Sequence, residues 1–359
     1  MPSVTQDQVL AALRTVKDPE LFKDIVTLGM VKDVKVTDSN VELTVELTTP
    51  ACPLKDVIEK DVTTALKGIG VEQVKLNLTA NTRGAGAGAQ KRDALPQVKN
   101  IVAVGAGKGG VGKSTIALNL AVGLQRCGAK VGLMDGDIYG PSMPTMLGIR
   151  GTPPHVRGNK ILPHEVHGIH AITIGSLVEQ DKPLIWRGPM AHGAFKQLLL
   201  DNTEWPELDY LIVDLPPGTG DVPLTLCQLL PLTGAVVVAT PQQVALDDAI
   251  RAVRMFQTLG APVLGIVENM SYIPLPDGGM LDMFGRGGTE RTARELGLPF
   301  LGELPMFPEL RVNSDIGKPH ANFEGDPRLR DALQIIVTKL AGEVSKRNLG
   351  PQGPQLNVT

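Results

Sequence analysis

The feature that most constrains this chain is a glycine-rich run at residues 107–115, which reads Gly-Lys-Gly-Gly-Val-Gly-Lys-Ser-Thr. The run has the spacing of a phosphate-binding loop, in which two glycines five positions apart precede Lys113 and Ser114. A short apolar stretch of strand character, 100–104, comes before it, and an apolar stretch of helical character, 114–124, comes after it. A strand, a glycine loop and a helix in this order are the context that the motif requires. The sequence therefore predicts a nucleotide-binding site.

Each position of the loop has an expected role in holding a triphosphate. Glycines allow the backbone to wrap around phosphates without clashes of a Cβ atom, and N–H groups at the start of a helix favour negative charge. We expect Lys113 to lie on the β- and γ-phosphates, and the Ser114 hydroxyl to ligate Mg²⁺. Lys108 is an additional lysine, either a solvated surface residue or a group that reaches a partner's nucleotide as an arginine finger does. The complete expected nucleotide-binding set also includes Gly107, Gly109, Gly110, Val111, Gly112 and Thr115.

Carboxylates follow two further predicted strands, at the sheet edge where ligands bind in doubly wound folds. Asp214 ends the apolar run 211–213, which is the expected place for a carboxylate that holds Mg²⁺ through water. Asp135 and Asp137 end the run 130–134, and we expect one of them to orient the attacking water or to act through Mg²⁺. An aspartate after a strand is often only a turn former. The two strand-end sites, taken together with the loop, favour the catalytic interpretation.

The composition limits the class of protein. Of the 359 residues, 42% are apolar, 20% are charged and 3% are aromatic, and the net charge is −3. These values are typical of a globular protein, and they favour neither a nucleic-acid nor a membrane partner. The N-terminal residues lack the pattern of a secretory signal, no apolar stretch approaches the length of a membrane span, and the three cysteines form no disulfide framework. We therefore expect a cytoplasmic protein.

The order of apolar patterns predicts two domains. Residues 1–80 combine helical spacing with an alternating strand at 41–47, which indicates a small α+β domain. Residues 81–98 are rich in glycine and alanine and are predicted to be a flexible linker, and 346–359 are predicted to be a disordered tail. Apolar strands alternate with helices over 99–345, which indicates an α/β domain with a doubly wound, mostly parallel sheet and the phosphate loop after its first strand. The expected strands lie at 100–105, 130–134, 209–213, 235–239 and 263–267.

Three histidines, His164, His167 and His170, recur at intervals of three residues. The run does not match the His-Glu-x-x-His zinc motif, because Gly168 stands where the second histidine of the motif would be. Pro163 and Gly168 also argue against a single helix that presents the three rings together. We interpret the segment as a solvated loop that leads into a strand rather than as a metal site.

The loop sequence at 108–115 resembles the deviant phosphate loop of the superfamily that contains MinD, Mrp and the nitrogenase iron protein. Further segments resemble the Mrp (ApbC-like) branch and cover nearly all of 99–345: Asp-Gly-Asp-Ile-Tyr-Gly-Pro-Ser at 135–142, Trp-Arg-Gly-Pro-Met at 186–190, the run ending Asp-Leu-Pro-Pro-Gly-Thr-Gly-Asp at 208–221, Glu-Asn-Met-Ser-Tyr at 268–272 and Phe-Gly-Arg-Gly-Gly at 284–288. The N-terminal unit resembles the iron–sulfur assembly domain that is often fused to Mrp proteins, in the segments 16–20, 24–29 and 48–53.

This resemblance implies a function and several residue roles. Mrp proteins are ATPases that carry iron–sulfur clusters to apoproteins, and by resemblance Lys108 reaches across a nucleotide-sandwich homodimer. The resemblance also implies that Asn269 contacts adenine, and that Asp137 rather than Asp135 positions water. The expected cofactors are ATP and Mg²⁺. The expected partners are a second copy of the chain and apo iron–sulfur proteins or assembly factors, with no nucleic acid and no membrane.

One departure from the family pattern concerns the iron–sulfur cluster itself. After Glu-Asn-Met-Ser-Tyr the family has a Cys-x-x-Cys pair whose thiolates hold a cluster between two subunits, and here the corresponding positions are Leu275 and Gly278. Neither side chain is a ligand for iron. Our hypothesis is that Cys52, doubled by dimerisation, is the thiol site, with burial as a small apolar residue as the alternative. Cys127 and Cys227 are interpreted as packing residues.

The leading interpretation is a homodimeric, Mg²⁺-dependent ATPase of iron–sulfur cluster assembly or transfer. One alternative is a MinD-like positioning ATPase, although the stretch 327–345 has the pattern of an ordinary amphipathic helix rather than of a basic membrane-surface helix. The other alternative is a nucleotide-gated scaffold that binds no cluster, in which the N-terminal domain recruits partners.

Overall fold

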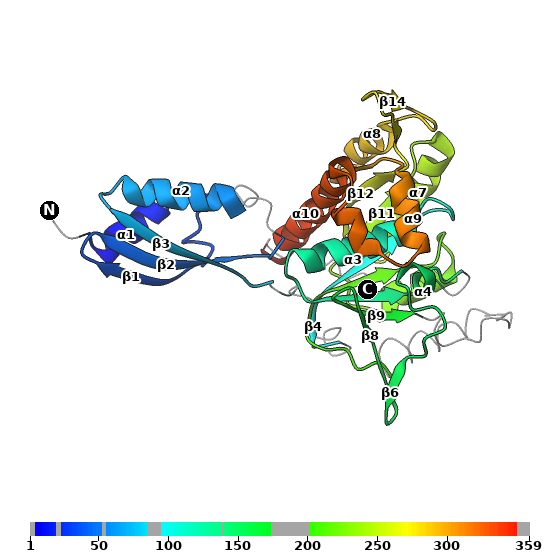
Figure 1. Ribbon diagram of the computed structural model, residues 1–359, viewed down its shortest axis with the longest axis horizontal. Helices are drawn as coiled ribbons and strands as arrows, with labels where there is room; N and C mark the ends of the chain where they lie inside the picture. Colours follow the sequence, from blue (N-terminus) through cyan, green and yellow to red (C-terminus); the bar gives the residue numbers. More distant parts are fainter. Residues whose placement is uncertain are drawn as a thin grey trace, which may run out of the picture. The chain divides into compact units, whose positions relative to one another are not determined.

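The computed structural model describes residues 4–18, 23–51, 55–82, 84, 95–137, 140–173 and 202–349. The chain divides into two compact units, Met1–Arg83 together with Ser345–Thr359, and Gly84–Val344. Each unit has its own sheet (Figure 1). Each also has its own hydrophobic core.

The first unit is a small α+β domain. Its sheet has the order β1-β2-β3, with β1 and β2 antiparallel and β2 and β3 parallel. Alternate residues of β2 are buried, and Leu43 of this strand packs in one core with Ile58 and Leu66 of α2. One apolar face of the sheet is thus covered by helices. The elements are α1 (Gln6–Leu13), β1 (Val31–Thr37), β2 (Asn40–Leu47), α2 (Lys55–Lys67) and β3 (Gln73–Ala80).

The second unit is built around a sheet of eight strands in the order β15-β12-β11-β4-β10-β5-β9-β8. All neighbouring strands run parallel except β8, which pairs antiparallel with β9 at the edge. The doubly wound, mostly parallel fold that the sequence predicts is therefore confirmed. The strands are β4 (Val98–Gly105), β5 (Val131–Asp135), β8 (His164–Val166), β9 (Ile169–Thr173), β10 (Leu208–Asp214), β11 (Gly234–Ala239), β12 (Val263–Asn269) and β15 (Phe300–Leu304).

The second unit also contains helices and two small hairpins, and its last helix, α10, continues beyond Val344, the last residue of this unit. Among the residues that the structure describes, no helix is both long enough and apolar enough to cross a membrane. The hairpins are β6 (His155–Arg157) with β7 (Lys160–Leu162), and β13 (Ile273–Pro274) with β14 (Met280–Leu281). The helices are α3 (Lys113–Arg126), α4 (Met143–Met146), α6 (Asp221–Leu229), α7 (Gln243–Thr258), α8 (Gly288–Glu295), α9 (Pro308–Asp315), the 3-10 helix η4 (Pro319–Phe323) and α10 (Pro327–Leu349).

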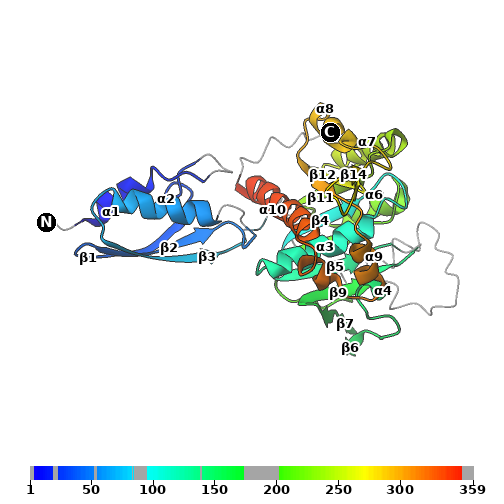
Figure 2. The same cartoon turned by 45° about the horizontal axis from the view of Figure 1, so that its top comes forward.

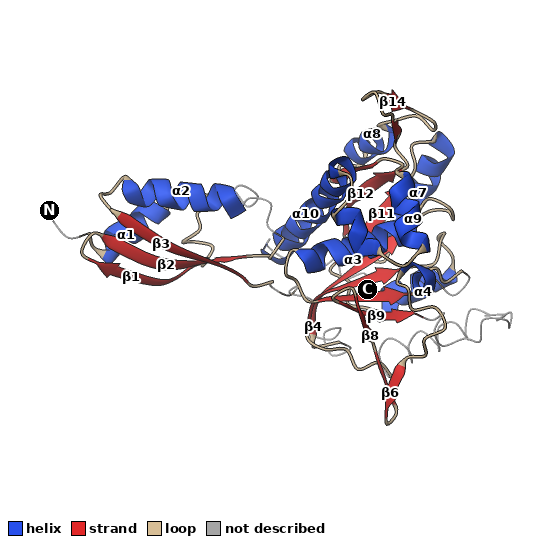
Figure 3. Ribbon diagram, viewed as in Figure 1, coloured by secondary structure: helices blue, strands red, loops and turns tan. Residues whose placement is uncertain are grey.

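Helices cover both faces of the large sheet (Figures 2 and 3). On one face α6, α7 and α8 share a core with the strands, in which Phe256 and Ala293 pack with Val213. On the other face α3 packs on β4, β5 and β10, and α10 approaches α3 so closely that a Cβ atom at Gly123 would lie 2.4 Å from Val337. The carboxyl ends of β4, β10 and β5 therefore meet at one edge of the sheet, between two helical layers.

Two predicted boundaries differ from the structure. The predicted linker 81–98 is ordered at its end, because Leu95 is buried and a turn closed by the Val98 N–H and the Leu95 carbonyl, at 3.1 Å, folds it back onto the core. Residues 83 and 85–94 of that segment lie outside the described residues. The predicted tail 346–359 begins inside a helix, because α10 continues to Leu349. Residues 350–359 lie outside the described residues.

Because the two cores are separate, we expect Leu66→Ala to lower the free energy of unfolding of the first unit alone, by about 2–5 kcal/mol. Leu66 is fully buried, whereas Val57 on the same helix is 42% exposed, so Val57→Ala is the matched control. Differential scanning calorimetry should show one transition shifted downwards and the other unchanged. A shift of both transitions in the Leu66→Ala protein would contradict the separation of the cores.

Candidate functional site

The glycine loop joins the end of β4 to the start of α3, and contacts on two sides hold its shape. Gly107 lies against α7, where a Cβ atom would be 2.0 Å from the backbone oxygen of Asp248. Gly112 caps α3 with a φ of +81°, and a Cβ atom there would be 2.1 Å from Nδ2 of Asn269. Glycine alone combines this left-handed backbone with the close approach. The loop backbone is therefore shaped by packing before any ligand binds.

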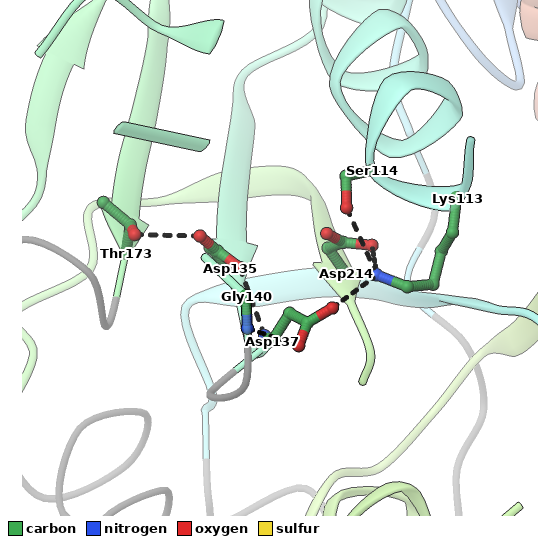
Figure 4. Close-up of polar contacts among 7 residues, drawn as sticks. All are labelled: Lys113, Ser114, Asp135, Asp137, Gly140, Thr173 and Asp214. Atoms are coloured by element: carbon green, nitrogen blue, oxygen red, sulfur yellow. Dashed lines mark hydrogen bonds and ion pairs between the residues drawn. The ribbon is translucent and has the colours of Figure 1, made fainter. Parts of the chain in front are cut away.

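Lys113, the first residue of α3, places a buried ammonium group at the head of the loop (Figure 4). Its Nζ lies 2.6 Å from Oδ1 of Asp214 and 3.6 Å from Oδ2 of Asp137. It also donates to Oγ of Ser114 at 3.3 Å. The Lys113 and Asp214 side chains are 7% and 0% exposed, so each charge compensates the other for its loss of water. The structure thus brings together the lysine, the serine and two of the aspartates predicted from the sequence.

Asp135 ends β5 directly beside Asp214, its partner in the register of β10. The Asp135 carboxylate accepts hydrogen bonds from Oγ1 of Thr173 at 2.9 Å and from the backbone N–H of Asp137 at 3.1 Å. Burial, followed by the negative charge of Asp214, raises the pKa of Asp135 to about 7. Figure 4 shows Asp135 turned toward Thr173, whereas Asp137 points to Lys113. The two carboxylates of this pair therefore have different surroundings.

Asp214 and Ser114 provide oxygen atoms that suit a divalent cation. Oδ2 of Asp214 is buried and accepts no hydrogen bond from any described residue. Burial also raises the pKa of the Asp214 carboxyl above its ordinary value. This carboxylate oxygen is short of partners and close to a serine hydroxyl, and Mg²⁺ takes such oxygen atoms together with water and phosphate oxygens. The residues present therefore fit the ion.

Asn269 ends β12 and lies against the loop, where its Nδ2 donates to the Val111 carbonyl at 2.8 Å. Together with Gly112 and Thr115 it lines a pocket of about 700 Å³. Much of the remaining lining is apolar, and the sequence analysis missed it because it comes from segments far apart along the chain. These apolar residues are Met146, Met270, Ile273, Pro305, Met306, Phe307, Pro308 and Leu310.

Lys108 lies on the open side of the loop. Its side chain is half-exposed, and the neighbouring Gly109 and Gly110 are exposed. No hydrogen bond or ion pair joins the Lys108 side chain to any residue in the described part of the chain. In contrast to the buried Lys113, this lysine is available to a ligand or to a second molecule.

Leu275 and Gly278, which the resemblance places at the positions of the family's cysteine pair, lie in a tight turn between β13 and β14. Leu275 donates its N–H to the Gly279 carbonyl at 2.8 Å, and Gly278 donates to the Leu275 carbonyl at 3.1 Å. Gly278 has a left-handed φ of +84°, a conformation that favours glycine. Backbone hydrogen bonds close this turn, and neither Leu275 nor Gly278 carries a side-chain group that binds iron.

The three cysteines differ in their surroundings. Cys52 lies outside the described residues. Cys227 is buried, and burial raises the pKa of its thiol to about 12, so it is not a reactive thiolate. Cys127 accepts a hydrogen bond from Nε2 of Gln334 at 3.5 Å. The contacts of Cys127 and Cys227 agree with their interpretation as packing residues.

The three evenly spaced histidines lie on a β-hairpin rather than in a loop. His164 begins β8, His170 lies in β9, and His167 occupies the turn between them. The expectation of a solvated segment is wrong for His164, which is 7% exposed because β8 joins the sheet edge. Within the described ranges, no group of three or more His, Cys, Asp or Glu side chains is placed to hold a metal ion.

The protonation of Asp135 predicts a pH dependence of stability. The folded state keeps this proton up to about pH 7, whereas the ordinary pKa is 3.8, so the free energy of unfolding should fall as pH rises between these values. Asp135→Asn removes the titration, and its amide group can still accept from Asp137 and donate to Thr173. We expect wild type to lose up to roughly 1.4 kcal/mol per pH unit relative to the variant.

Urea unfolding of both proteins at three values between about pH 5 and 7 measures this difference. Parallel pH profiles of the two proteins would show that Asp135 is already ionised in the folded state.

Two protein families match this chain over the two units. Residues 97–341 match the family described as ParA: NUBPL iron-transfer P-loop NTPase. Residues 6–76 match the family described as iron-sulfur cluster assembly protein. The first match includes the phosphate loop and all of the aspartates discussed above.

Individual proteins agree with these matches. The chain is 48% identical to the iron-sulfur cluster carrier protein of Synechocystis over 95% of this chain and 98% of the relative, and 48% identical to the protein of the same name from Deinococcus radiodurans over 98% and 99%. The solved nucleotide-binding protein from Archaeoglobus fulgidus, in complex with ADP, is 36% identical with a TM-score of 0.58, over 66% of this chain and 93% of that one. The cell division ATPase MinD from Pyrococcus furiosus, at 21% identity and a TM-score of 0.50 over 69% and 98%, shares the fold. The chain therefore belongs to the family of ParA- and NUBPL-type iron-transfer P-loop NTPases.

Proposed function

We propose that this protein is a Mg²⁺-dependent ATPase that delivers iron–sulfur clusters to apoproteins in the cytoplasm. The observation that carries the proposal is the buried Lys113 ammonium, which lies between the carboxylates of Asp214 and Asp137 at the head of a phosphate loop. Relatives that are called iron-sulfur cluster carrier proteins, and that match nearly the whole chain, support the choice of cargo. The cluster is the substrate that is carried.

Binding of a triphosphate would change the partners of Lys113. Backbone N–H groups of the loop and of the first turn of α3 attract phosphate oxygens. The Lys113 ammonium exchanges the Asp214 carboxylate for the β- and γ-phosphates. Ser114 directly and Asp214 through water are the residues that would hold Mg²⁺. When bound, Mg²⁺ neutralises charge on the phosphate oxygens.

Asp137 is the residue that we propose to orient the attacking water. Its Oδ2 lies 3.6 Å from Nζ of Lys113, and its Oδ1 accepts from the Gly140 N–H at 3.3 Å. The carboxylate is therefore held at the phosphate end of the loop, where it can accept a hydrogen bond from water. Asp135 holds the backbone of Asp137 and acts as a positioning residue rather than as a catalytic one.

Lys108 is proposed to complete the site of a second copy of the chain. It is half-exposed at the open side of the loop, and phosphoryl transfer gains much from a cation that reaches the site only when two molecules assemble. ATP binding would thus close a homodimer, and hydrolysis would reopen it. Apo iron–sulfur proteins or assembly factors would meet one of these two states.

The pocket beside Gly112 and Thr115 is proposed to take the adenosine. Its volume of about 700 Å³ and its apolar lining, which includes Met270 and Met306, suit an aromatic base. Nδ2 of Asn269 already donates a hydrogen bond to the Val111 carbonyl. We therefore expect Oδ1 of Asn269 to accept a hydrogen bond from the adenine amino group.

Cys52 from each of two copies is the proposed ligand set for the carried cluster. Leu275 and Gly278 replace the usual pair of cysteines, and Cys227 is buried with a raised thiol pKa. The same replacement favours a second candidate function, a nucleotide-gated scaffold of cluster assembly that holds no cluster itself. Iron analysis separates the two functions.

The first prediction from this proposal concerns hydrolysis. We expect Lys113→Ala to abolish ATP hydrolysis and to weaken nucleotide binding, because the phosphates lose their buried cation. We expect Lys108→Ala to lower kcat by ~10³ or more, as loss of an arginine finger does, while ADP binding is kept. Lys318→Ala, at an exposed lysine after α9, is the matched control.

Phosphate release measures the rates, and calorimetric titration with ADP measures binding. Equal rates for wild type and Lys113→Ala would refute the assignment of the site. A wild-type rate of hydrolysis in the Lys108→Ala protein would contradict only the proposal that Lys108 acts in the site of a second copy.

The second prediction concerns the cargo. After anaerobic reconstitution we expect wild type to contain iron and acid-labile sulfide, and Cys52→Ser to lose both. Cys127→Ser should keep them, because Cys127 contacts Gln334 within the second unit. Iron that is retained in full by Cys52→Ser protein would disprove the proposed ligands, and a wild type without iron would favour the scaffold.

A further inference from the structure

Two histidines from distant parts of the sequence meet in the second unit. His167 occupies the turn between β8 and β9, and His320 lies in η4. Their Nδ1 atoms are 3.2 Å apart, their ring centroids are 5.2 Å apart, and the ring planes are inclined by 35°. Both residues are half-buried, so the pair remains accessible to solvent and small ions.

The tautomer of His167 follows from its second contact. Its Nε2 lies 3.0 Å from the carbonyl oxygen of Leu147, at the end of α4. A carbonyl oxygen only accepts hydrogen bonds, so Nε2 carries the hydrogen and Nδ1 of the neutral ring carries a lone pair. A hydrogen bond from one ring nitrogen to a backbone carbonyl is the usual support of a histidine that binds a metal through its other nitrogen.

The two ring nitrogens are within hydrogen-bond distance of each other, and the distances between the rings also fit a shared ion. Two imidazoles that bind one tetrahedral ion at about 2.0–2.1 Å have nitrogens ~3.3 Å apart and ring centroids ~5.2 Å apart. A straight N–H···N hydrogen bond of the observed length would separate the centroids by ~5.5 Å. The observed 3.2 Å and 5.2 Å therefore describe rings whose Nδ1 atoms converge.

We propose that His167 and His320 form a site for a divalent transition-metal ion of the zinc type, held by both Nδ1 atoms. Imidazole nitrogen is a preferred ligand of Zn²⁺, Ni²⁺ and Cu²⁺. No larger group of His, Cys, Asp and Glu side chains surrounds such an ion among the residues described, so water completes the coordination. This site is separate from the phosphate loop, and it does not depend on the proposed ATPase or cargo.

A bound ion would tie three segments together: the β8–β9 turn, the end of α4 through the Leu147 carbonyl, and η4. The end of α4 and η4 both adjoin the 700 Å³ pocket. Met146 of α4 lines this pocket, and so does Ser314 of α9, the helix that precedes η4. Gly148 and Gly317 already pack backbone to backbone here, since a Cβ atom at Gly317 would lie 2.4 Å from Cα of Gly148. Metal binding would therefore stabilise this junction and raise the melting temperature of the second unit.

The test uses Zn²⁺ and the full-length protein labelled with ¹⁵N-histidine. One equivalent of Zn²⁺ should shift the Nδ1 resonances of two histidines, because each ring nitrogen gives its lone pair to the ion. His167→Asn and His320→Gln should each weaken Zn²⁺ binding in calorimetry at least ~10-fold. Loss of a residue that only hydrogen-bonds to a metal ligand already lowers metal affinity by about that factor. Asparagine is chosen because it tolerates the φ of +51° at this turn.

His155→Gln is the matched control, because His155 is an exposed histidine of β6 in the same unit. It should leave both shifts and the affinity unchanged. Urea unfolding without metal shows whether each variant is folded, and the wild-type spectrum tests the site without any variant. The proposal is overturned if Zn²⁺ shifts no histidine Nδ1 or only one in wild type, or if either folded variant binds Zn²⁺ as wild type does.

Discussion

The buried ion pair between Lys113 and Asp214 is the interaction on which the rest of the site depends. The lysine opens helix α3, whose N-terminal end disfavours a positive charge, and its side chain is shielded from water. The ammonium is stable there only because carboxylates at the ends of neighbouring strands surround it. That arrangement requires β4, β10 and β5 to be adjacent with level carboxyl ends, as the pairing of Asp214 with Val104 and with Asp135 provides. The sheet order is therefore part of the chemistry of the site.

Close packing on two sides holds the phosphate loop in place, and the same packing leaves no room for side chains at Gly107 and Gly112. Helix α7 approaches Gly107 from one side, and the amide of Asn269 holds the Val111 carbonyl from the other. The residue before that asparagine, Glu268, accepts hydrogen bonds from the N–H groups of Gly287 and Thr289 at the start of α8. The end of β12 therefore anchors both the loop and the segment that follows the β13–β14 hairpin. A preorganised loop loses little conformational freedom when it binds a phosphate chain.

Much of the architecture was predictable because short apolar stretches of the sequence indicate its strands and helices. Apolar runs such as 209–213 and 235–239 indicate strands that are buried on both faces, and the structure has strands at both places. The strands at the edge of the sheet were harder to predict from the sequence. β8 and β9 are short, and their histidines and the glycine between them interrupt the apolar pattern of a strand. The packing of Leu95 was missed because a glycine- and alanine-rich neighbourhood conceals a single apolar residue that a turn carries back to the core.

The sequence by itself determined the phosphate loop, the lysine and serine within it and the aspartates at the strand ends, because each is a local pattern of residue types at fixed spacing. Only the tertiary structure decided that Asp137 contacts Lys113 while Asp135 turns to Thr173, since this depends on the register of β5 against β9. The same holds for the apolar pocket and for the meeting of His167 with His320. Contacts between residues far apart along the chain depend on the order in which strands and helices pack. The local spacing of residue types in the sequence does not determine that order.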